Sequence, residues 1–220
     1  MILTLCFCFA AIIRQDMDGR PSRPPIQLGW HDELRNVNRW RPLDMDNKAK
    51  CEIIAAGNVR LSLGHVPEGW PYGFQWSGLK RNVTADVARF PVLMAFVGPV
   101  RGYAHLDVDV LDADGKAVKT IRSNTVNVTA VKRSSMPGME GANSDRFQVP
   151  AGVLQCELAK ELLPATYSMQ IRMIVGGGNG GCSATYHWIG FVAQKDAEWL
   201  ADHPNYVVSR GIPDFDARRR

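Results

Sequence analysis

The chain has 220 residues, of which 45% are hydrophobic and 22% are charged, a composition that is ordinary for a globular domain and excludes disorder throughout. The net charge is +4, but the terminal residues Arg218, Arg219 and Arg220 supply three of the positive charges, and without them it is +1. No basic stripe runs along the rest of the sequence, so we expect no nucleic-acid partner.

The chain begins with an apolar run, residues 1–13, followed by Arg14, Gln15 and Asp16. The run is shorter than the roughly 20 residues that span a bilayer, and its length fits the apolar core of a secretory signal. A membrane anchor, a mis-assigned start codon or a buried strand are the alternatives. We expect residues 1–15 to be a signal peptide, the protein to be secreted or periplasmic/extracellular, and the mature domain to have no transmembrane segment.

Residues 15–25 are polar and rich in proline, so we expect a linker over residues 16–39. Short apolar, alternating or β-branched stretches follow, separated by Gly, Pro, Asn and Asp, and they predict about eight or nine strands. The expected strands or their approaches are residues 51–56, 58–63, 74–79, 81–88, 90–97, 105–111, 117–121, 124–130, 162–175 (after a turn at Pro164) and 184–192.

Two of these stretches are the most informative. Residues 90–97 (FPVLMAFV) are continuously apolar, which is typical of a central strand buried on both faces. In residues 105–110, His105, Asp107 and Asp109 alternate with apolar residues, which predicts a half-buried strand, and the Asp112–Ala113–Asp114–Gly115 turn then leads into a return strand.

Less regular segments lie between the later strands. Residues 147–153 and 158–163 flank a connection that the pattern does not define, residues 176–181 (GGGNGG) are expected to form a flexible turn, and residues 195–202 a short helix or turn. The fold class is therefore all-β, an antiparallel β-sandwich or jelly roll with short flanking helical turns. We expect the β-sandwich domain to cover residues 40–194, and a C-terminal helical turn and tail to cover residues 195–220.

Four sequence stretches carry a family resemblance: TADVARFPVL (residues 84–93), DADGK (112–116), LPATYSMQIR (163–172) and YHWIGFV (186–192). Over residues 40–192 the chain resembles the galactose-binding-like jelly-roll domains, which include many carbohydrate-binding modules of secreted polysaccharide-degrading enzymes. The resemblance implies a β-sandwich whose central strand follows the Phe-Pro-x-Leu segment. It also implies a carbohydrate ligand and a structural calcium, although this fold serves protein binding as well.

Trp70, Tyr72 and Trp76 cluster around a Gly- and Pro-rich loop and are our main candidate for a binding site. Exposed aromatic rings bind sugars by stacking on the apolar face of a pyranose. The alternative is that Trp76 packs inward and Trp70 plugs one end of the sandwich. On the last strand, alternation places Tyr186 and Trp188 on one face and His187 on the other, so a ring platform on that strand is a further possibility, and His187 is a fourth candidate ligand residue.

Asp44 and Asp46 offer oxygen ligands before the first strand of the expected sandwich domain and are our candidates for a calcium site. Asp112 and Asp114 have similar spacing, but the hairpin turn explains them. Cys51, Cys156 and Cys182 remain after the leader, an odd number; either one pair forms a disulfide or all three are buried thiols.

The motifs of enzyme active sites are missing from the sequence. Asp107 and Asp109 would lie roughly 7 Å apart on one strand, a separation found in glycosidases, but no cleft is implied and we interpret them as solvated outer-face residues. There is no nucleophile motif of the GxSxG kind. We therefore expect a non-catalytic exported β-sandwich that binds a polysaccharide or glycan through exposed aromatic residues; the alternative is a protein-interaction or structural module of an extracellular or envelope assembly.

Overall fold

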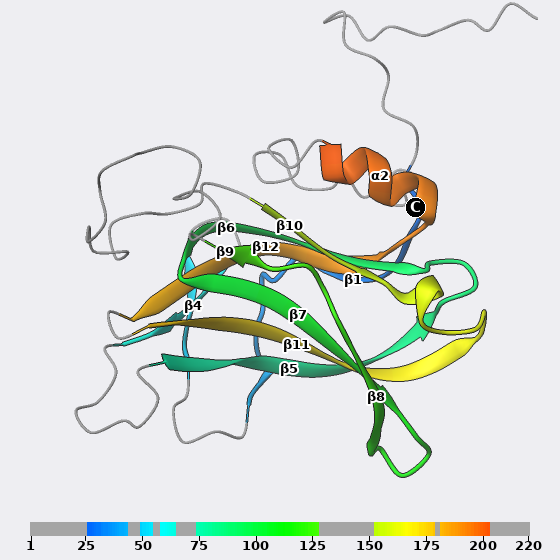
Figure 1. The fold of residues 1–220 in the computed structure, drawn as a ribbon, viewed down its shortest axis with the longest axis horizontal. Coiled ribbons are helices and arrows are strands. Elements are labelled where there is room, and N and C mark those ends of the chain that lie inside the picture. The colour runs from blue at the N-terminus through cyan, green and yellow to red at the C-terminus, as the bar shows by residue number, and fades with distance from the viewer. Residues whose placement is uncertain are drawn as a thin grey trace, which may run out of the picture.

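Two antiparallel sheets pack face to face in the computed structural model, which describes residues 26–43, 49–54, 58–64, 74–127, 152–178 and 181–202 (Figure 1). We name each sheet after a strand in its interior. The β6 sheet has the order β10 (Gly152–Glu157), β6 (Val92–Arg101), β12 (Cys182–Val192), β4 (Asn58–Leu63) and β3 (Lys50–Ile54), with β1 (Leu28–Asp32) also paired to β12. The β11 sheet has the order β2 (Arg41–Pro42), β5 (Phe74–Asp86), β11 (Thr166–Gly178), β7 (Tyr103–Leu111) and β8 (Ala117–Arg122), with β9 (Val126–Asn127) also paired to β7.

The predicted central strand is β6, and it is buried on both faces. Leu93, Ala95 and Val97 face the core between the two sheets. Met94 and Phe96 face the other side, where the helix α2 (Gln194–Asp202) covers the β6 sheet (Figure 1). A strand that contacts apolar side chains on both faces needs a continuous apolar run, which is the pattern that the sequence shows. The predictions of an all-β sandwich and of a short helix near residue 195 are confirmed.

The alternating hairpin forms where predicted, although β7 is buried on both faces and not half-buried. Leu106, Val108 and Val110 of β7 point into the core, so the residues between them point to the outer face of the β11 sheet. In the turn, the Asp112 carboxylate accepts hydrogen bonds from the backbone N–H of Asp114 (3.0 Å) and of Lys116 (2.8 Å). The aspartate side chain therefore stabilises the turn, as expected from its chemistry.

The strand β12 changes face partway along its length. Tyr186 and Phe191 point into the core between the sheets, whereas Trp188 points to the opposite side, toward α2. The register of β12 against β6 shifts on both sides of Tyr186, and such a bulge moves the following side chains to the other face. The prediction that Tyr186 and Trp188 share one face is therefore wrong.

The strand β1 lies inside residues 16–39, where the sequence predicted a linker. It pairs with β12, and the ring of Trp30 lies 6.0 Å from that of Phe191. Arg81 of β5 places its guanidinium over Trp30, at 5.0 Å, and forms an ion pair with Asp32. Because Trp30 packs against the core and Asp32 is paired, residues 28–32 belong to the sandwich and not to a linker.

Two further segments differ from the sequence pattern. Gly176, Gly177 and Gly178 continue β11 and pair with β5 as far as Phe74, so the expectation of a turn starting at residue 176 is wrong. The strand β10 occupies the connection that the sequence left undefined, and it pairs with β6 along its whole length. In both cases pairing with a neighbouring strand, which local sequence does not reveal, outweighs weak intrinsic strand preference.

Candidate functional site

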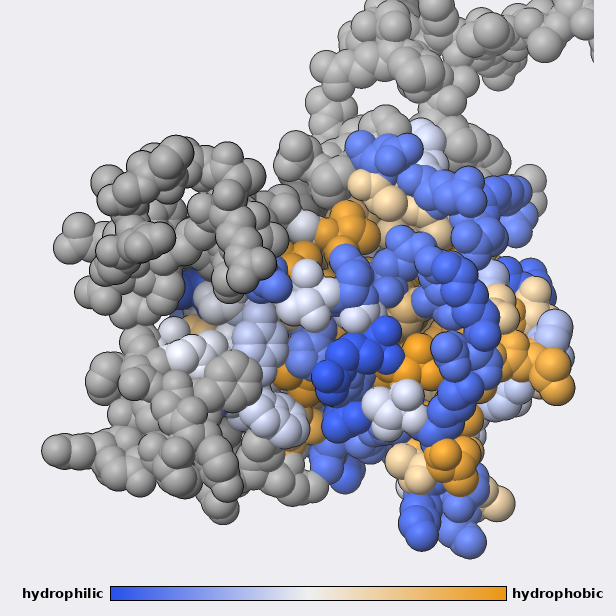
Figure 2. Space-filling view, viewed as in Figure 1, coloured by the Kyte–Doolittle hydropathy of each residue, from blue (hydrophilic) through white to orange (hydrophobic). Residues whose placement is uncertain are grey.

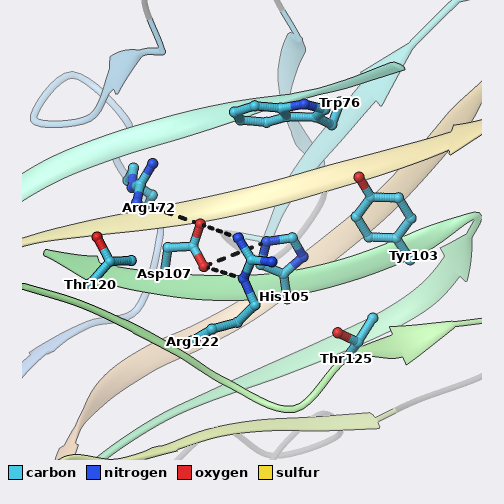
Figure 3. A pocket seen from close by; sticks show the side chains of 8 residues that line it. All are labelled: Trp76, Tyr103, His105, Asp107, Thr120, Arg122, Thr125 and Arg172. Atoms are coloured by element: carbon cyan, nitrogen blue, oxygen red, sulfur yellow. Dashed lines mark hydrogen bonds and ion pairs between the residues drawn. The ribbon is translucent and has the colours of Figure 1, made fainter. Parts of the chain in front are cut away.

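A cavity of about 650 Å³ opens on the outer face of the β11 sheet, within the size range of small-ligand sites. Four neighbouring strands and the segment before β9 supply its walls (Figure 3). Hydrophilic side chains dominate the face of the molecule seen in Figure 2, with hydrophobic ones in small separate patches. The lining residues are Trp76, Tyr103, His105, Asp107, Thr120, Arg122, Thr125 and Arg172.

Strand alternation and register bring these side chains together. Tyr103, His105 and Asp107 are alternate residues of β7 and therefore share its outer face. The pairing of β7 with β11 places Arg172 beside Asp107, and the pairing with β8 places Arg122 on the other side of Asp107. Side chains that are far apart in the chain thus form cross-strand rows on one sheet.

One end of the cavity is aromatic. Trp76 of β5 is 38% exposed, and the ring of Tyr103 stacks on that of His105 at 5.6 Å with an interplanar angle of 8° (Figure 3). Gly176 lies between Trp76 and Tyr103 in the sheet, and a Cβ atom there would come within 2.2 Å of the Tyr103 ring. The missing side chain therefore lets the tyrosine ring lie across β11. Burial raises the pKa of Tyr103 to about 12, so its hydroxyl stays protonated at neutral pH.

The other end is a network of ion pairs. The Asp107 carboxylate accepts two hydrogen bonds from Arg122, from Nε at 2.7 Å and from Nη2 at 3.3 Å. Nη2 of Arg172 donates to Asp109 at 2.8 Å and lies 3.5 Å from Asp107, so this one guanidinium bridges both carboxylates. The hydroxyl of Thr120 also donates to Asp109, at 2.5 Å. Charged groups in such a network hold one another in a fixed geometry.

The interpretation of Asp107 and Asp109 as solvated residues is wrong. They lie on the outer face as predicted, but Asp107 is only 3% exposed and Asp109 only 7%. Their arginine partners come from neighbouring strands and cover them. The sequence therefore revealed the face of each residue but not its burial, because burial depends on side chains from β8 and β11.

The environment of Asp107 keeps it ionised. Burial by itself would raise the pKa of this carboxyl, but hydrogen bonds with His105 and Arg122 and the positive charge of Arg172 outweigh burial and hold the pKa well below its usual range. Asp107 is therefore a hydrogen-bond acceptor and a negative charge at all ordinary pH values, and it does not act as an acid.

The pKa of Asp107 is lower in the folded protein than in the unfolded chain, so its ionised carboxylate stabilises the fold. This stabilisation is fully present above about pH 4 and is lost as the pH falls toward the folded-state pKa. We expect Asp107→Asn to lower the free energy of unfolding by roughly 2 kcal/mol at pH 7, because Arg122 is 62% exposed and can return to water. The difference from the wild type should shrink at pH 3. Urea denaturation of both proteins at the two pH values measures it, and a difference that stays constant or grows at pH 3 would contradict the assignment.

The structure separates the residues that the sequence selected as candidate ligand-binding residues. Trp76 lines the cavity. His187 lies on β12 in the other sheet, where its Nε2 donates a hydrogen bond to the carbonyl oxygen of Gly98 at 2.5 Å. The remaining candidates, Trp70 and Tyr72 for the ligand and Asp44 and Asp46 for calcium, lie outside the described residues.

Sequence reasoning did not select Tyr103, Arg122 and Arg172, which line the cavity. Alternation along β7 already places Tyr103 on the face of His105 and Asp107, so that residue could have been found. Arg172 is 63 residues from Asp109 and 65 from Asp107, and no local pattern links it to them.

Metal and thiol chemistry find no support in the part of the chain that the structure describes. No group of three or more His, Cys, Asp or Glu side chains there could hold a metal ion. Cys51, Cys156 and Cys182 are all free, which settles the alternatives in favour of three thiols. Burial raises the pKa of both Cys156 and Cys182 to about 12, so these thiols are protonated and unreactive at neutral pH.

The fold and the site define an antiparallel β-sandwich with a ligand-sized polar and aromatic cavity on one sheet. Among the described residues, no helix has the length and apolar character to cross a membrane. No protein-family model matches the sequence, and no curated protein matches it.

Several solved structures have a similar fold. A carbohydrate-binding module of the β-sandwich superfamily, described as promiscuous in specificity, aligns over 71% of this chain and 58% of its own, with 8% identity and a TM-score of 0.44. A module described for specific mannan recognition aligns over 78% and 99%, with 12% identity and a TM-score of 0.44. The enzymatically active domain of tailspike protein 4 of bacteriophage CBA120 aligns over 72% and 20%, with 12% identity and a TM-score of 0.41. The likeness is confined to the β-sandwich fold.

Proposed function

We propose that this protein is a non-catalytic, exported module that binds carbohydrate in the cavity on the β11 sheet. The observation that carries the proposal is the pairing of an exposed indole, Trp76, with a preformed hydrogen-bonding network in one cavity. Export is proposed from the apolar leader, with residues 1–15 as the signal and the sandwich domain extending to about residue 194.

The two ends of the cavity match the two sides of a sugar ring. A pyranose has an apolar C–H face, which stacks on an aromatic ring, and a rim of hydroxyl groups, which need both donors and acceptors. Trp76 and Tyr103 supply the rings. Arg122 and Arg172 supply donors that Asp107 holds in place before any ligand arrives, and the hydroxyl groups of the exposed residues Thr120 and Thr125 supply acceptor oxygens. A site that is already ordered loses little conformational entropy on binding.

The same geometry argues against glycoside hydrolysis at this site. A glycosidase needs one carboxylic acid that carries a proton and one carboxylate. Asp107 has a lowered pKa, so it is not a proton donor, and Asp109, which accepts hydrogen bonds from both Arg172 and Thr120, does not line the cavity.

Affinity electrophoresis of the purified protein through gels that contain different polysaccharides tests the proposal. We expect at least one polysaccharide to slow the protein relative to a gel without polysaccharide, because a preformed site on an extended face should bind a chain measurably. If no polysaccharide in a broad panel slows it, the proposal is wrong, and a protein-interaction or structural module is the better account. Trp70 and Tyr72 remain predicted additional aromatic residues of the binding site, and their alanine variants should be tested on the same polysaccharides.

A further inference from the structure

We infer that Asp109, which does not line the cavity, makes the site selective for uncharged ligands because its ion pair with Arg172 neutralises the charge of that guanidinium. The inference rests on the proposed function and concerns its ligand class: neutral polysaccharides should bind, and polysaccharides that carry uronate groups should not. Asp109 is thus a specificity-determining residue that acts through Arg172, without contact to the ligand.

The charges of the lining residues alone do not balance. Arg122 and Arg172 both line the cavity, whereas Asp107 is the only carboxylate among the lining residues that the structure describes. Asp107 accepts both hydrogen bonds from Arg122 and so offsets that guanidinium. Without another carboxylate, Arg172 would leave the cavity with a net positive charge, which would attract an anion.

Asp109 supplies the missing negative charge. Its Oδ1 atom lies 2.8 Å from Nη2 of Arg172, which is closer than the 3.5 Å between that nitrogen and Asp107. Asp109 occupies the next outward position of β7 and pairs with Thr120 of β8. The two positive charges of the arginines and the two negative charges of Asp107 and Asp109 then sum to zero. A ligand carboxylate entering the cavity would lose its water and gain no net attraction in return.

Arg172 still has hydrogen-bonding capacity for a neutral ligand. Its guanidinium lines the cavity and carries five N–H donors, of which Nη2 donates to Asp109. A ligand oxygen can therefore accept a hydrogen bond from an N–H that the two aspartates do not use. A hydroxyl or ring oxygen satisfies this donor without adding charge. Lys80, the neighbour of Arg172 on β5, does not line the cavity.

The test compares Asp109→Asn with Asp114→Asn in affinity electrophoresis on a neutral polysaccharide panel and on alginate and polygalacturonate. Both substitutions change the protein charge by the same amount. Asp114, however, lies exposed in the hairpin turn, where its backbone N–H donates a hydrogen bond to Asp112. Asparagine at position 109 keeps an oxygen for Thr120 and Arg172 but removes the charge.

We expect the wild type and Asp114→Asn to bind a neutral polysaccharide and neither acidic one. Asp109→Asn should bind the acidic polysaccharides at least about tenfold more tightly than the wild type, with an affinity that falls as salt rises, and should keep neutral binding within about threefold. Equal behaviour of the two variants, or binding of the wild type to an acidic polysaccharide, would overturn the inference while leaving the proposed function standing.

Two other outcomes are also decisive. If the wild type binds none of the polysaccharides, the proposed function fails and the inference fails with it. If Asp109→Asn does not fold, as judged by its thermal transition, the wild type is tested alone on the two acidic polysaccharides at about 0.05 M salt. Absence of binding there, with binding to a neutral polysaccharide, supports a charge-balanced cavity, and binding that weakens as salt rises contradicts it.

Discussion

Trp76→Ala should remove most of the affinity for the polysaccharide that slows the wild-type protein. Trp76 presents the more exposed of the two rings at the aromatic end of the cavity, and large aromatic side chains commonly dominate binding energy. We expect a loss of at least about 2 kcal/mol, which is roughly 30-fold in the dissociation constant. Affinity electrophoresis over a series of polysaccharide concentrations gives this constant directly.

The same substitution should change stability little. Trp76 is 38% exposed and is not part of either apolar core cluster, so its removal leaves no core cavity. The expected change in the free energy of unfolding is about 1 kcal/mol, the scale of strand preference. Trp76→Phe, which keeps a ring, should retain part of the affinity, and Leu163→Ala, at a side chain that is 79% exposed, should change neither property. A large loss of stability in Trp76→Ala with binding intact would show that the ring is structural.

Phe96→Ala should produce the largest loss of stability among the variants considered. Phe96 is fully buried on the side of β6 that faces α2, and its ring lies 6.0 Å from that of Trp188. Truncation of a buried phenylalanine removes its apolar contacts and leaves a cavity, at a cost of about 3–5 kcal/mol. The midpoint of urea denaturation measures the loss, and the slope of the transition shows whether unfolding remains cooperative.

Val118→Ala is the matched control, since Val118 lies on the edge strand β8 and is 63% exposed. It should change stability by no more than about 0.5 kcal/mol. If Phe96→Ala were as mild as this control, the packing of α2 on the β6 sheet would not be a major source of stability, and the helix would be an accessory to the fold.

The elements that the sequence predicted well are those whose environment is uniform along the strand. Residues 92–97 contact apolar neighbours on both faces, so their continuous apolar run shows their burial. In β7 one face is apolar and the other polar, so alternation shows which side chains face the core. The turn at Asp112 is stabilised by that residue's own side chain. In all three cases the determining interactions are local or repeat along the strand.

The candidate site could be predicted only in part. Trp76 stood out as an aromatic residue near a loop, and alternation placed Asp107 and Asp109 on the outer face. The contact that makes these residues a site, Arg172 bridging both carboxylates, joins β11 to β7 across more than 60 residues. The residue pattern of one strand does not reveal its register against the neighbouring strand, and that register determines which charged side chains lie side by side.

The amino-acid sequence alone determined that this protein is an antiparallel sandwich with a doubly buried central strand, because the periodicity of apolar residues follows directly from which faces lose contact with water. Only the tertiary structure decided that β1 joins the sheet, that a bulge turns Trp188 away from Tyr186, and that two aspartates expected in solvent are buried beneath arginines. These features depend on partners brought from distant parts of the chain, and their energy comes from pairs of residues rather than from any residue on its own.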